Sequence, residues 1–292
     1  LEDIRACATL NNNVQMPWLG FGTFRIAEGE EAYQSVRHAL DAGYRSVDTA
    51  SMYGNEISIG RAVRDSGIPR GEIFITTKLR NEDQRSGRVF QAFEESLEQL
   101  QMDYVDLYLV HWPVPGKYVD TWAAMQDIYR TGKTRAIGVS NFLVHHLQAI
   151  MTPGAVAPAV DQVEFHPLLQ SPGLYAFCRQ QGIQLEAWAP LMKGQGLIHP
   201  VIQEIAARHH KTAAQVVIRW ELQKGVVTIP NDGAHVSTLD DVKQDALSYQ
   251  LLGHNATLQQ ANRLLVPVVD NYGRAWPAGT PISLRDDFNT LD

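Results

Sequence analysis

Short apolar runs alternate along this chain with longer stretches in which apolar residues recur at helical spacing. Eight of the short runs have the length of strands, and they cover residues 19–24, 44–50, 73–78, 105–111, 134–141, 159–165, 183–190 and 225–230. The stretches between them, such as 30–43, 88–101 and 212–225, repeat apolar residues every three or four positions. Several end in Gly, which helix C-caps favour. The pattern predicts a regular alternation of strands and helices.

Near-continuous apolar strands separated by helices are typical of a parallel sheet that is covered by helices. Eight such units in one chain favour a closed (β/α)8 TIM barrel over an open sheet. Ahead of the barrel, residues 7–17 (CATLNNNVQMP) predict two short strands about an Asn-rich turn, because Asn tolerates left-handed backbone. We expect this N-terminal β-hairpin to close the barrel floor.

The chain of 292 residues contains no repeat or linker that divides it, so we expect one domain over residues 1–292. Its last part nevertheless has a different composition. Residues 231–292 contain eight Asp, four Lys or Arg and no Glu. This divergent C-terminal segment still predicts a helix over 237–265, followed by a stretch punctuated by Pro and Gly.

Composition excludes several classes of protein. The formal net charge of −7 argues against nucleic-acid binding, and no apolar run reaches the length of about 18 residues that a membrane span needs. Cys7 and Cys178 lie far apart and form no metal-ligand spacing, and no secretory signal pattern precedes the first strand. We therefore expect a cytoplasmic protein with no metal, no nucleic-acid partner and no membrane partner.

Polar residues recur where the predicted strands end, which in a TIM barrel is the end that carries the active site. They are Asp48, Lys78, His111, Ser140, Asn141, Gln162 and Trp188. Core packing does not explain a polar residue at the same end of six strands. We therefore expect these side chains to surround one mouth of the barrel.

Asp48, Tyr53, Lys78 and His111 form the group with the clearest chemistry. A Lys at the end of an apolar strand needs a counter-charge, and Asp48 on the neighbouring strand is the natural partner. Tyr53 follows Asp48 by five residues, and an ammonium beside its phenol is expected to lower the phenol pKa from about 10. With His111 donating a hydrogen bond, the set predicts protonation of a carbonyl oxygen.

Ser140, Asn141 and Gln162 add neutral hydrogen-bonding groups to the same mouth, and Trp188 adds a flat face. This combination suits a nicotinamide ring, whose carboxamide needs both a donor and an acceptor. Residues 191–197 (LMKGQGL) then predict a Gly-containing loop whose backbone N–H groups approach a pyrophosphate. Three other kinds of site are excluded because their motifs are incomplete or wrongly spaced. They are a dinucleotide fingerprint at 20–25, a nucleophile elbow at 138–142 and metal sites at the adjacent His pairs.

The sequence resembles the aldo-keto reductases, and in particular the bacterial group with 2,5-diketogluconate and glyoxal reductases. The resemblance spans 9–230 and rests on stretches such as GYRSVDTASMYGNE, VDLYLVHWPVP, RAIGVSNF, DQVEFHP and EAWAPL. It implies that Asp48, Tyr53, Lys78 and His111 are the catalytic tetrad, with Tyr53 as proton donor. It also implies that Ser140, Asn141, Gln162 and Trp188 contact the nicotinamide.

The resemblance extends to further positions. Thr23 and Leu191 match positions beside the cofactor, whereas Phe24 and Trp112 match positions that line the substrate pocket. Ala189 stands where many members have Ser, so one cofactor hydrogen bond is absent from the expected set. The implied cofactor is NADP(H), the implied partner is a small-molecule carbonyl substrate, and a monomer is the common state among relatives.

The resemblance fails after residue 230, where the family normally places Lys-Ser and later an Arg and a Glu-Asn pair around the adenosine 2'-phosphate. Here Asn231 and Asp232 hold the Lys and Ser positions, and Ser237, Asp240 and Asp241 replace the later residues. Because an Asp repels phosphate and accepts from a ribose diol, NAD(H) is a possible cofactor. The alternative is that the turn is displaced and the Asp232 side chain faces water.

Two functions remain open at this point. One is NAD(P)H-dependent reduction of aldehydes or ketones, either small carbonyls or keto-sugars, with Tyr as the proton donor. The other is a cofactor-binding regulatory or redox-sensor barrel with little turnover. The presence of the whole tetrad favours the enzyme. Within the divergent segment, Tyr272 and Trp276 are candidates to line the substrate pocket, as the terminal loop of the family does.

Overall fold

The computed structural model describes residues 4–230, apart from the side chains of Lys193 and Gln195. Eight parallel strands form one sheet, in which each strand is hydrogen-bonded to the next along the chain. They are β3 (Phe21–Gly22), β4 (Ser46–Asp48), β5 (Phe74–Leu79), β6 (Val105–Val110), β7 (Thr134–Ser140), β8 (Val160–Glu164), β9 (Gln184–Trp188) and β10 (Val227–Thr228). Each of the eight predicted segments overlaps one strand, so the predicted order of strands is confirmed.

The two edges of this sheet meet. A parallel bridge joins Leu19, just before β3, to Thr228 of β10. Its hydrogen bonds run from Gly20 N to the Thr228 carbonyl oxygen at 2.9 Å and from Thr228 N to the Trp18 carbonyl oxygen at 3.1 Å. The (β/α)8 barrel predicted from the sequence is thereby confirmed, and it is closed by contacts between the first and last strands.

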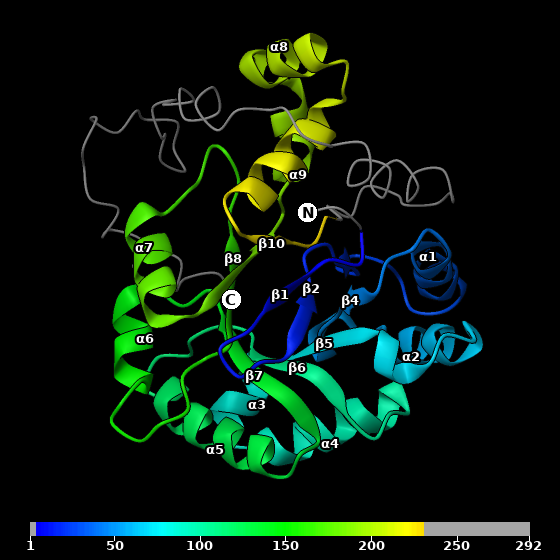
Figure 1. The fold of residues 1–292 in the computed structure, drawn as a ribbon. Coiled ribbons are helices and arrows are strands. Elements are labelled where there is room, and N and C mark those ends of the chain that lie inside the picture. The colour runs from blue at the N-terminus through cyan, green and yellow to red at the C-terminus, as the bar shows by residue number, and fades with distance from the viewer. Residues whose placement is uncertain (1–3, 231–292) are drawn as a thin grey trace.

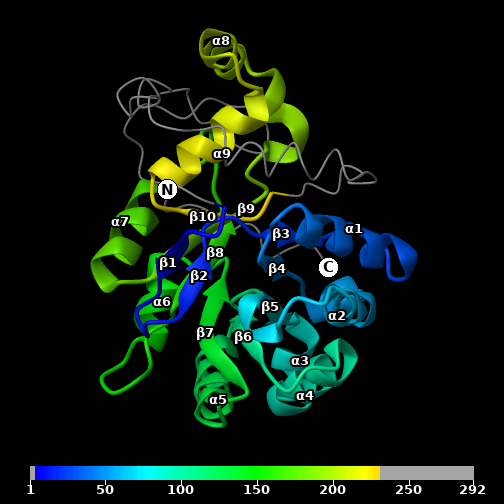
Figure 2. The same ribbon diagram turned by 45° about the vertical axis from the view of Figure 1, so that its right-hand side comes forward.

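Helices surround the strands on the outside (Figures 1 and 2). They are α1 (Glu30–Asp41), α2 (Glu56–Asp65), α3 (Asn81–Ser86), α4 (Val89–Leu100), α5 (Tyr118–Arg130), α6 (Val144–Ile150), α7 (Pro172–Gln181), α8 (Pro200–His209) and α9 (Ala213–Gln223). Three 3-10 helices complete the described elements: η1 (Ser51–Tyr53), η2 (Arg70–Glu72) and η3 (Met192–Ile198). The helix predicted over 237–265 lies outside the described residues.

Two α-helices were not predicted. The helix α3 has six residues, which is too short for apolar periodicity to show. The helix α8 buries only Ile202 and Ala206, so its apolar face is narrow, although Pro200 at its first position is a typical N-terminal signal. The stretch 191–197, predicted as a loop, is mostly the 3-10 helix η3, and there the Gly194 N–H donates to the Leu191 carbonyl oxygen at 3.0 Å.

Local signals explain why the predicted helices form where they do. At the start of α9, the Thr212 hydroxyl accepts from the Gln215 N–H at 3.2 Å, while the Gln215 side chain accepts from the Thr212 N–H at 2.8 Å. This capping box satisfies two backbone donors that the helix leaves unpaired. The buried residues Ala213 and Val217 of α9 are four positions apart on one helical stripe, and they pack in one cluster with Ile202 of α8.

The predicted hairpin is confirmed as β1 (Cys7–Thr9) and β2 (Gln15–Pro17), which pair antiparallel. Asn13 in its turn has a φ of 68°, the left-handed conformation that Asn tolerates. Figures 1 and 2 show the hairpin across one end of the barrel. Its buried side chains Ala8 and Met16 pack in one cluster with Phe74, the first residue of β5, so the hairpin closes the end at which the strands begin.

The helix α2 lies very close to the end of α4, and the contact depends on Gly60. A Cβ atom at this position would lie 2.1 Å from the Leu100 carbonyl oxygen, which belongs to backbone. We expect Gly60→Ala to lower the free energy of unfolding by about 1–3 kcal/mol, the usual cost of overpacking. Urea unfolding measures this. Gly71→Ala is the matched control, because nothing lies within 4 Å of its Cβ; equal losses in both variants would contradict the steric argument.

The described part of the chain contains no helix with both the length and the apolar character that a membrane span requires. Cys7 and Cys178 are both free thiols, the first exposed and the second buried.

Candidate active site

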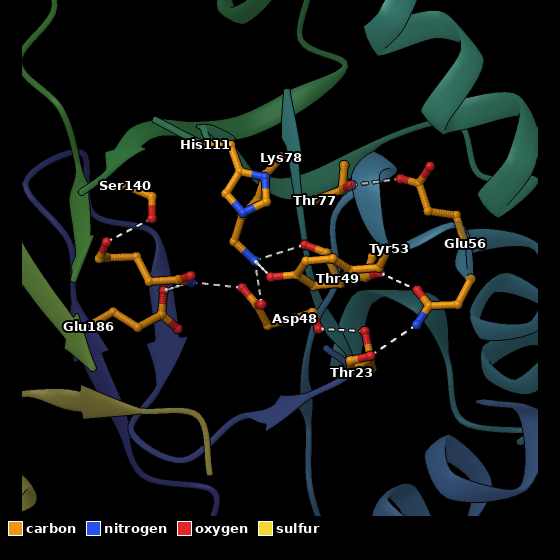
Figure 3. A network of polar contacts seen from close by, with 12 residues as sticks. Thr23, Asp48, Thr49, Tyr53, Glu56, Thr77, Lys78, His111, Ser140 and Glu186 are labelled. Carbon is orange, nitrogen blue, oxygen red and sulfur yellow. Dashed lines mark hydrogen bonds and ion pairs between the residues drawn. The ribbon is translucent and has the colours of Figure 1, made fainter. Parts of the chain in front are cut away.

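Polar side chains gather where the strands end, opposite the hairpin. Asp48, Ser140 and Trp188 are the last residues of β4, β7 and β9, Lys78 and Gln162 lie within the last three residues of β5 and β8, and His111 directly follows β6. Figure 3 shows that Asp48, Lys78, His111, Ser140 and Glu186 converge on one region. Asp48, Lys78, His111 and Ser140, which the sequence led us to expect at one mouth, thus lie together, because parallel strands bring their carboxyl ends to one rim.

Lys78 is fully buried and forms an ion pair with Asp48, which is also buried. The Lys78 ammonium donates further to the Thr49 carbonyl oxygen at 2.9 Å. Burial is the largest single influence and lowers the pKa of Lys78, but the attraction of Asp48, together with Tyr53 and Glu186, outweighs it, so the pKa lies above its usual value. Lys78 is thus a permanent buried cation with one carboxylate partner.

Tyr53 lies at the end of η1, the short helix that follows β4, and its hydroxyl is 3.5 Å from the Lys78 Nζ. Burial raises the pKa of Tyr53 above its usual value; the Lys78 ammonium opposes this rise and the Asp48 carboxylate adds to it. The expectation of a lowered phenol pKa is therefore wrong. Desolvation of the phenolate exceeds the attraction of a cation whose charge is already paired with Asp48. Tyr53 holds its proton at neutral pH.

A second layer of hydrogen bonds holds the segment that carries Tyr53. The Thr49 hydroxyl donates to Asn55 Oδ1 at 2.7 Å, and Asn55 Nδ2 donates to the carbonyl oxygens of Thr23 and Ile26, each at 3.0 Å. The Thr23 hydroxyl donates to the Asp48 carbonyl oxygen at 2.9 Å. These contacts tie β4, η1 and the loop after β3 together, which fixes the position of Tyr53. Thr49 and Asn55 were missed, since no sequence signal marks an Asn in a loop as a brace.

His111 is buried beside Tyr53, with 5.8 Å between their ring centroids and an angle of 72° between the ring planes. Burial, and secondarily the Lys78 ammonium, lower the pKa of His111 to about 3, so the imidazole is neutral. Its Nδ1 is buried and has no hydrogen-bond partner among the described residues. A neutral imidazole beside a phenol and an ammonium can orient a polar ligand atom without adding charge.

Ser140, Asn141 and Trp188 form a connected polar group on the other side of the mouth. Asn141 Nδ2 donates to the His111 carbonyl oxygen and to Ser140 Oγ, both at 3.0 Å, and its Oδ1 accepts from Trp188 Nε1 at 2.9 Å. Ser140 Oγ donates to the Gln162 carbonyl oxygen at 2.8 Å. These bonds fix the amide of Asn141 and the indole of Trp188 relative to each other.

Gln162 connects this group to the ion pair. Its Nε2 donates to Asp48 Oδ2 and to Glu186 Oε2, both at 2.8 Å (Figure 3). Glu186 lies within β9 and was not among the predicted site residues. The sequence held a signal for it, because Glu186 and Trp188 are two residues apart on one strand and therefore share a face.

Asp161 lies next to Gln162 on β8 but belongs to the opposite face of the strand. It is fully buried, and burial raises the pKa of its carboxyl well above the usual value, although the Phe142 backbone N–H opposes the shift. In the unfolded chain this group loses its proton near pH 4, whereas the folded protein keeps it. The free energy of unfolding therefore decreases as pH rises above about 4, over the range in which the folded protein still holds this proton.

We expect Asp161→Asn to remove this dependence, because the amide has nothing to ionise. Thermal unfolding at a series of pH values should show a higher melting temperature for the variant than for the wild type. The difference should be smallest near pH 4 and should grow towards pH 8. A variant less stable than wild type at pH 8 would contradict the expectation.

The predicted substrate residues lie at the rim. Phe24 and Trp112 are large apolar side chains with 44% and 38% exposure, and the Phe24 ring is 5.1 Å from the Tyr53 ring, centroid to centroid. Leu191 is partly buried just before η3. Asn231, Asp232, Tyr272 and Trp276 lie outside the described residues.

The groups of this mouth fit a nicotinamide. The side-chain oxygens of Ser140 and Gln162 can accept from its carboxamide NH2, and the Ser140 hydroxyl can donate to the carboxamide oxygen by turning away from the Gln162 carbonyl. The flat ring of the nicotinamide requires a flat partner such as Trp188. Among the described residues no cluster of His, Cys, Asp or Glu has the arrangement of a metal site.

A model of the Aldo/keto reductase family matches residues 18–244. The chain belongs to the aldo/keto reductase family. It is 54% identical over 221 residues to the glyoxal reductase of Bacillus subtilis (strain 168), which covers 76% of this chain and 80% of that one. It is 42% identical over 264 residues to the methylglyoxal reductase DkgA of Escherichia coli (strain K12), with 88% and 94% of the two chains covered.

Solved structures agree with this assignment. An aldo-keto reductase from a Medee basin deep-sea metagenome library superimposes with a TM-score of 0.81 at 42% identity, covering 88% of this chain and 93% of that one. This aldo/keto reductase is accordingly an oxidoreductase that acts on carbonyl compounds and uses a nicotinamide cofactor. The resemblance to the family is confirmed, and no relative supports the regulatory alternative.

Proposed function

We propose that this aldo/keto reductase reduces small aldehydes, α-oxoaldehydes in particular, to alcohols, with Tyr53 as the proton donor. One observation carries the proposal: the protonated Tyr53 hydroxyl lies 3.5 Å from the buried Lys78 ammonium and beside the neutral His111 ring. The α-oxoaldehyde class is suggested by relatives named glyoxal reductase and methylglyoxal reductase.

Each residue of the tetrad has a separate task in this reaction. A reduced nicotinamide, when bound, would supply a hydride for the carbonyl carbon. Tyr53 gives its phenolic proton to the carbonyl oxygen, so that an alcohol forms, and the resulting phenolate is stabilised by Lys78 until solvent restores the proton. Asp48 holds Lys78 in place, and His111 orients the carbonyl oxygen through an imidazole N–H.

The cofactor would be held by the opposite side of the mouth. Ser140, Asn141 and Gln162 would hold the carboxamide, and Trp188 would stack on the ring. Their mutual hydrogen bonds fix these groups before a ligand arrives, which reduces the entropy lost on binding. Thr23 and Leu191 would lie beside the cofactor, with Phe24, Trp112 and Trp276 around the substrate.

A second proposal concerns the choice of cofactor, with NADP(H) as the family's default. Asn231 and Asp232 replace the Lys-Ser of the family, so we expect the preference for NADPH over NADH to be weak. Initial rates with both cofactors measure this. Asn231→Lys with Asp232→Ser should raise kcat/KM for NADPH and lower it for NADH, and a large NADPH advantage in the wild type would overturn this proposal alone.

The reaction itself is tested by the oxidation of NADPH and NADH in the presence of methylglyoxal, glyoxal, benzaldehydes and keto-sugars. We expect the highest kcat/KM with the two dicarbonyl aldehydes. Single-turnover oxidation of bound reduced cofactor by methylglyoxal distinguishes an enzyme from a sensor. Absence of turnover with every compound, despite cofactor binding, would refute the proposed function.

A further inference from the structure

Glu186 is a buried carboxyl group that the proposed reaction does not use. It lies directly opposite Gln162 of β8 on one side and Val227 of β10 on the other. Its exposure is 1%, and its Oε2 accepts from Gln162 Nε2 at 2.8 Å. Because burial of a carboxyl group is costly, its place at the mouth calls for a physical role.

Glu186 fixes the orientation of the Gln162 amide. The amide nitrogen has two hydrogens, and Asp48 and Glu186 each accept one of them. With both donors held by carboxyl groups, the amide cannot turn over without losing two hydrogen bonds. Glu186 therefore acts on the cofactor site through Gln162, the residue proposed to contact the nicotinamide carboxamide.

The charged and titratable groups around Glu186 come from several elements. The Asp48 carboxylate of β4 raises the pKa of Glu186, and the Lys78 ammonium of β5 lowers it. Glu186 in turn raises the pKa of Tyr53, which lies on η1. On β8, Glu164 shares the strand face of Gln162, but it is partly exposed and lies 3.5 Å from His166 Nε2. The residue of β10 paired with Glu186, Val227, is apolar.

The charge of the mouth depends on Glu186. Lys78 and Asp48 cancel each other, Tyr53 holds its proton and His111 is neutral. Burial, followed by the Asp48 carboxylate, raises the pKa of Glu186 to about 8. At pH 7 Glu186 therefore keeps its proton, and the five groups together carry no net charge.

We infer that Glu186 is a positioning residue that gains or loses a proton according to the redox state of the bound cofactor, an inference that rests on the proposed function. Glu186 is neutral beside the reduced nicotinamide, which carries no ring charge, and ionised beside the oxidised nicotinamide, whose ring is a cation. The physical reason is that a cation in a water-poor site is stabilised by a nearby carboxylate more strongly than in water. The proton that Glu186 releases passes to solvent.

Binding calorimetry tests this on the full-length wild-type protein. NADP+ and NADPH are titrated at pH 7 in two buffers with different ionisation enthalpies, which counts the protons released. We expect the binding of NADP+ to release nearly one proton more than the binding of NADPH releases. The 2'-phosphate is common to both forms, so its own protonation cancels in the difference. At pH 9, where Glu186 is already ionised, the extra release should disappear.

Glu186→Gln keeps the size and the acceptor oxygen but cannot ionise. We expect the extra proton release to vanish and NADP+ to bind about tenfold more weakly, the equivalent of one pKa unit, while the Kd of NADPH changes less than twofold. Asp161→Asn is the matched control, since it removes a buried carboxyl one residue from Gln162 on the other strand face. Its ratio of the two Kd values should equal that of the wild type.

The outcomes separate this inference from the proposed function. If neither cofactor form binds the wild type, both fail. If both forms bind with equal proton release, or if Glu186→Gln keeps the wild-type ratio of Kd values, the inference alone fails. Should Glu186→Gln not fold, the proton count of the wild type decides by itself.

Discussion

Tyr53→Phe is expected to lower kcat for methylglyoxal reduction by about 10²–10⁴-fold, the usual contribution of a positioned general acid. Phe keeps the ring that contacts Phe24 and His111 and removes only the hydroxyl beside Lys78. The Kd of NADPH should change little, because Tyr53 faces the substrate in the proposed reaction. Steady-state kinetics with fluorescence titration of NADPH measures both quantities.

A matched control is Tyr33→Phe on the outer helix α1, which removes a hydroxyl that donates to Asp65 Oδ2 at 3.1 Å. It should keep wild-type turnover. Retained turnover in Tyr53→Phe would show that the proton comes from another group.

The second large effect is expected from Lys78→Met, both on stability and on activity. Removal of the ammonium leaves the Asp48 carboxylate buried without its counter-charge, which typically costs about 3–5 kcal/mol. Turnover should also be lost, because the phenolate of Tyr53 would have no cation beside it. Urea unfolding and the methylglyoxal assay measure the two effects.

The double variant Asp48→Asn with Lys78→Met separates them. It should recover more than half of the lost stability, since no unpaired charge remains, but it should recover no turnover. Lys133→Met is the control for an exposed pair, because Lys133 and Glu94 are about half exposed and such pairs contribute at most about 1 kcal/mol. A loss in Lys78→Met no larger than in Lys133→Met would contradict the assignment of a buried pair.

The fold was predictable because the parallel strands of a barrel are buried along their whole length and are therefore rich in apolar residues, as β6 shows. The site was predictable where a polar residue ends such a strand, as Asp48 and His111 do. Glu186 was missed because it stands inside its strand, two residues before the end, where it looks like an isolated exception to the apolar pattern.

Other features could not be read from the chain alone. The direction of the Tyr53 pKa depends on how much water reaches the phenol and on how fully Asp48 neutralises Lys78, both of which require coordinates. The helix α8 was missed because only two of its residues, Ile202 and Ala206, are buried, which is too few to show a periodic apolar pattern. The roles of Asn231 and Asp232 remain predictions from the sequence.

The bridge between Leu19 and Thr228 has a consequence for the order of events during synthesis. The two residues are separated by 209 positions, 228 minus 19, so the ring of strands cannot close until nearly the whole barrel has left the ribosome. Closing so long a loop has a large entropic cost, and such contacts form late. The same closure brings the Thr23 side of the mouth to the Glu186 side, so a nascent chain acquires a competent active site only in its final folding step.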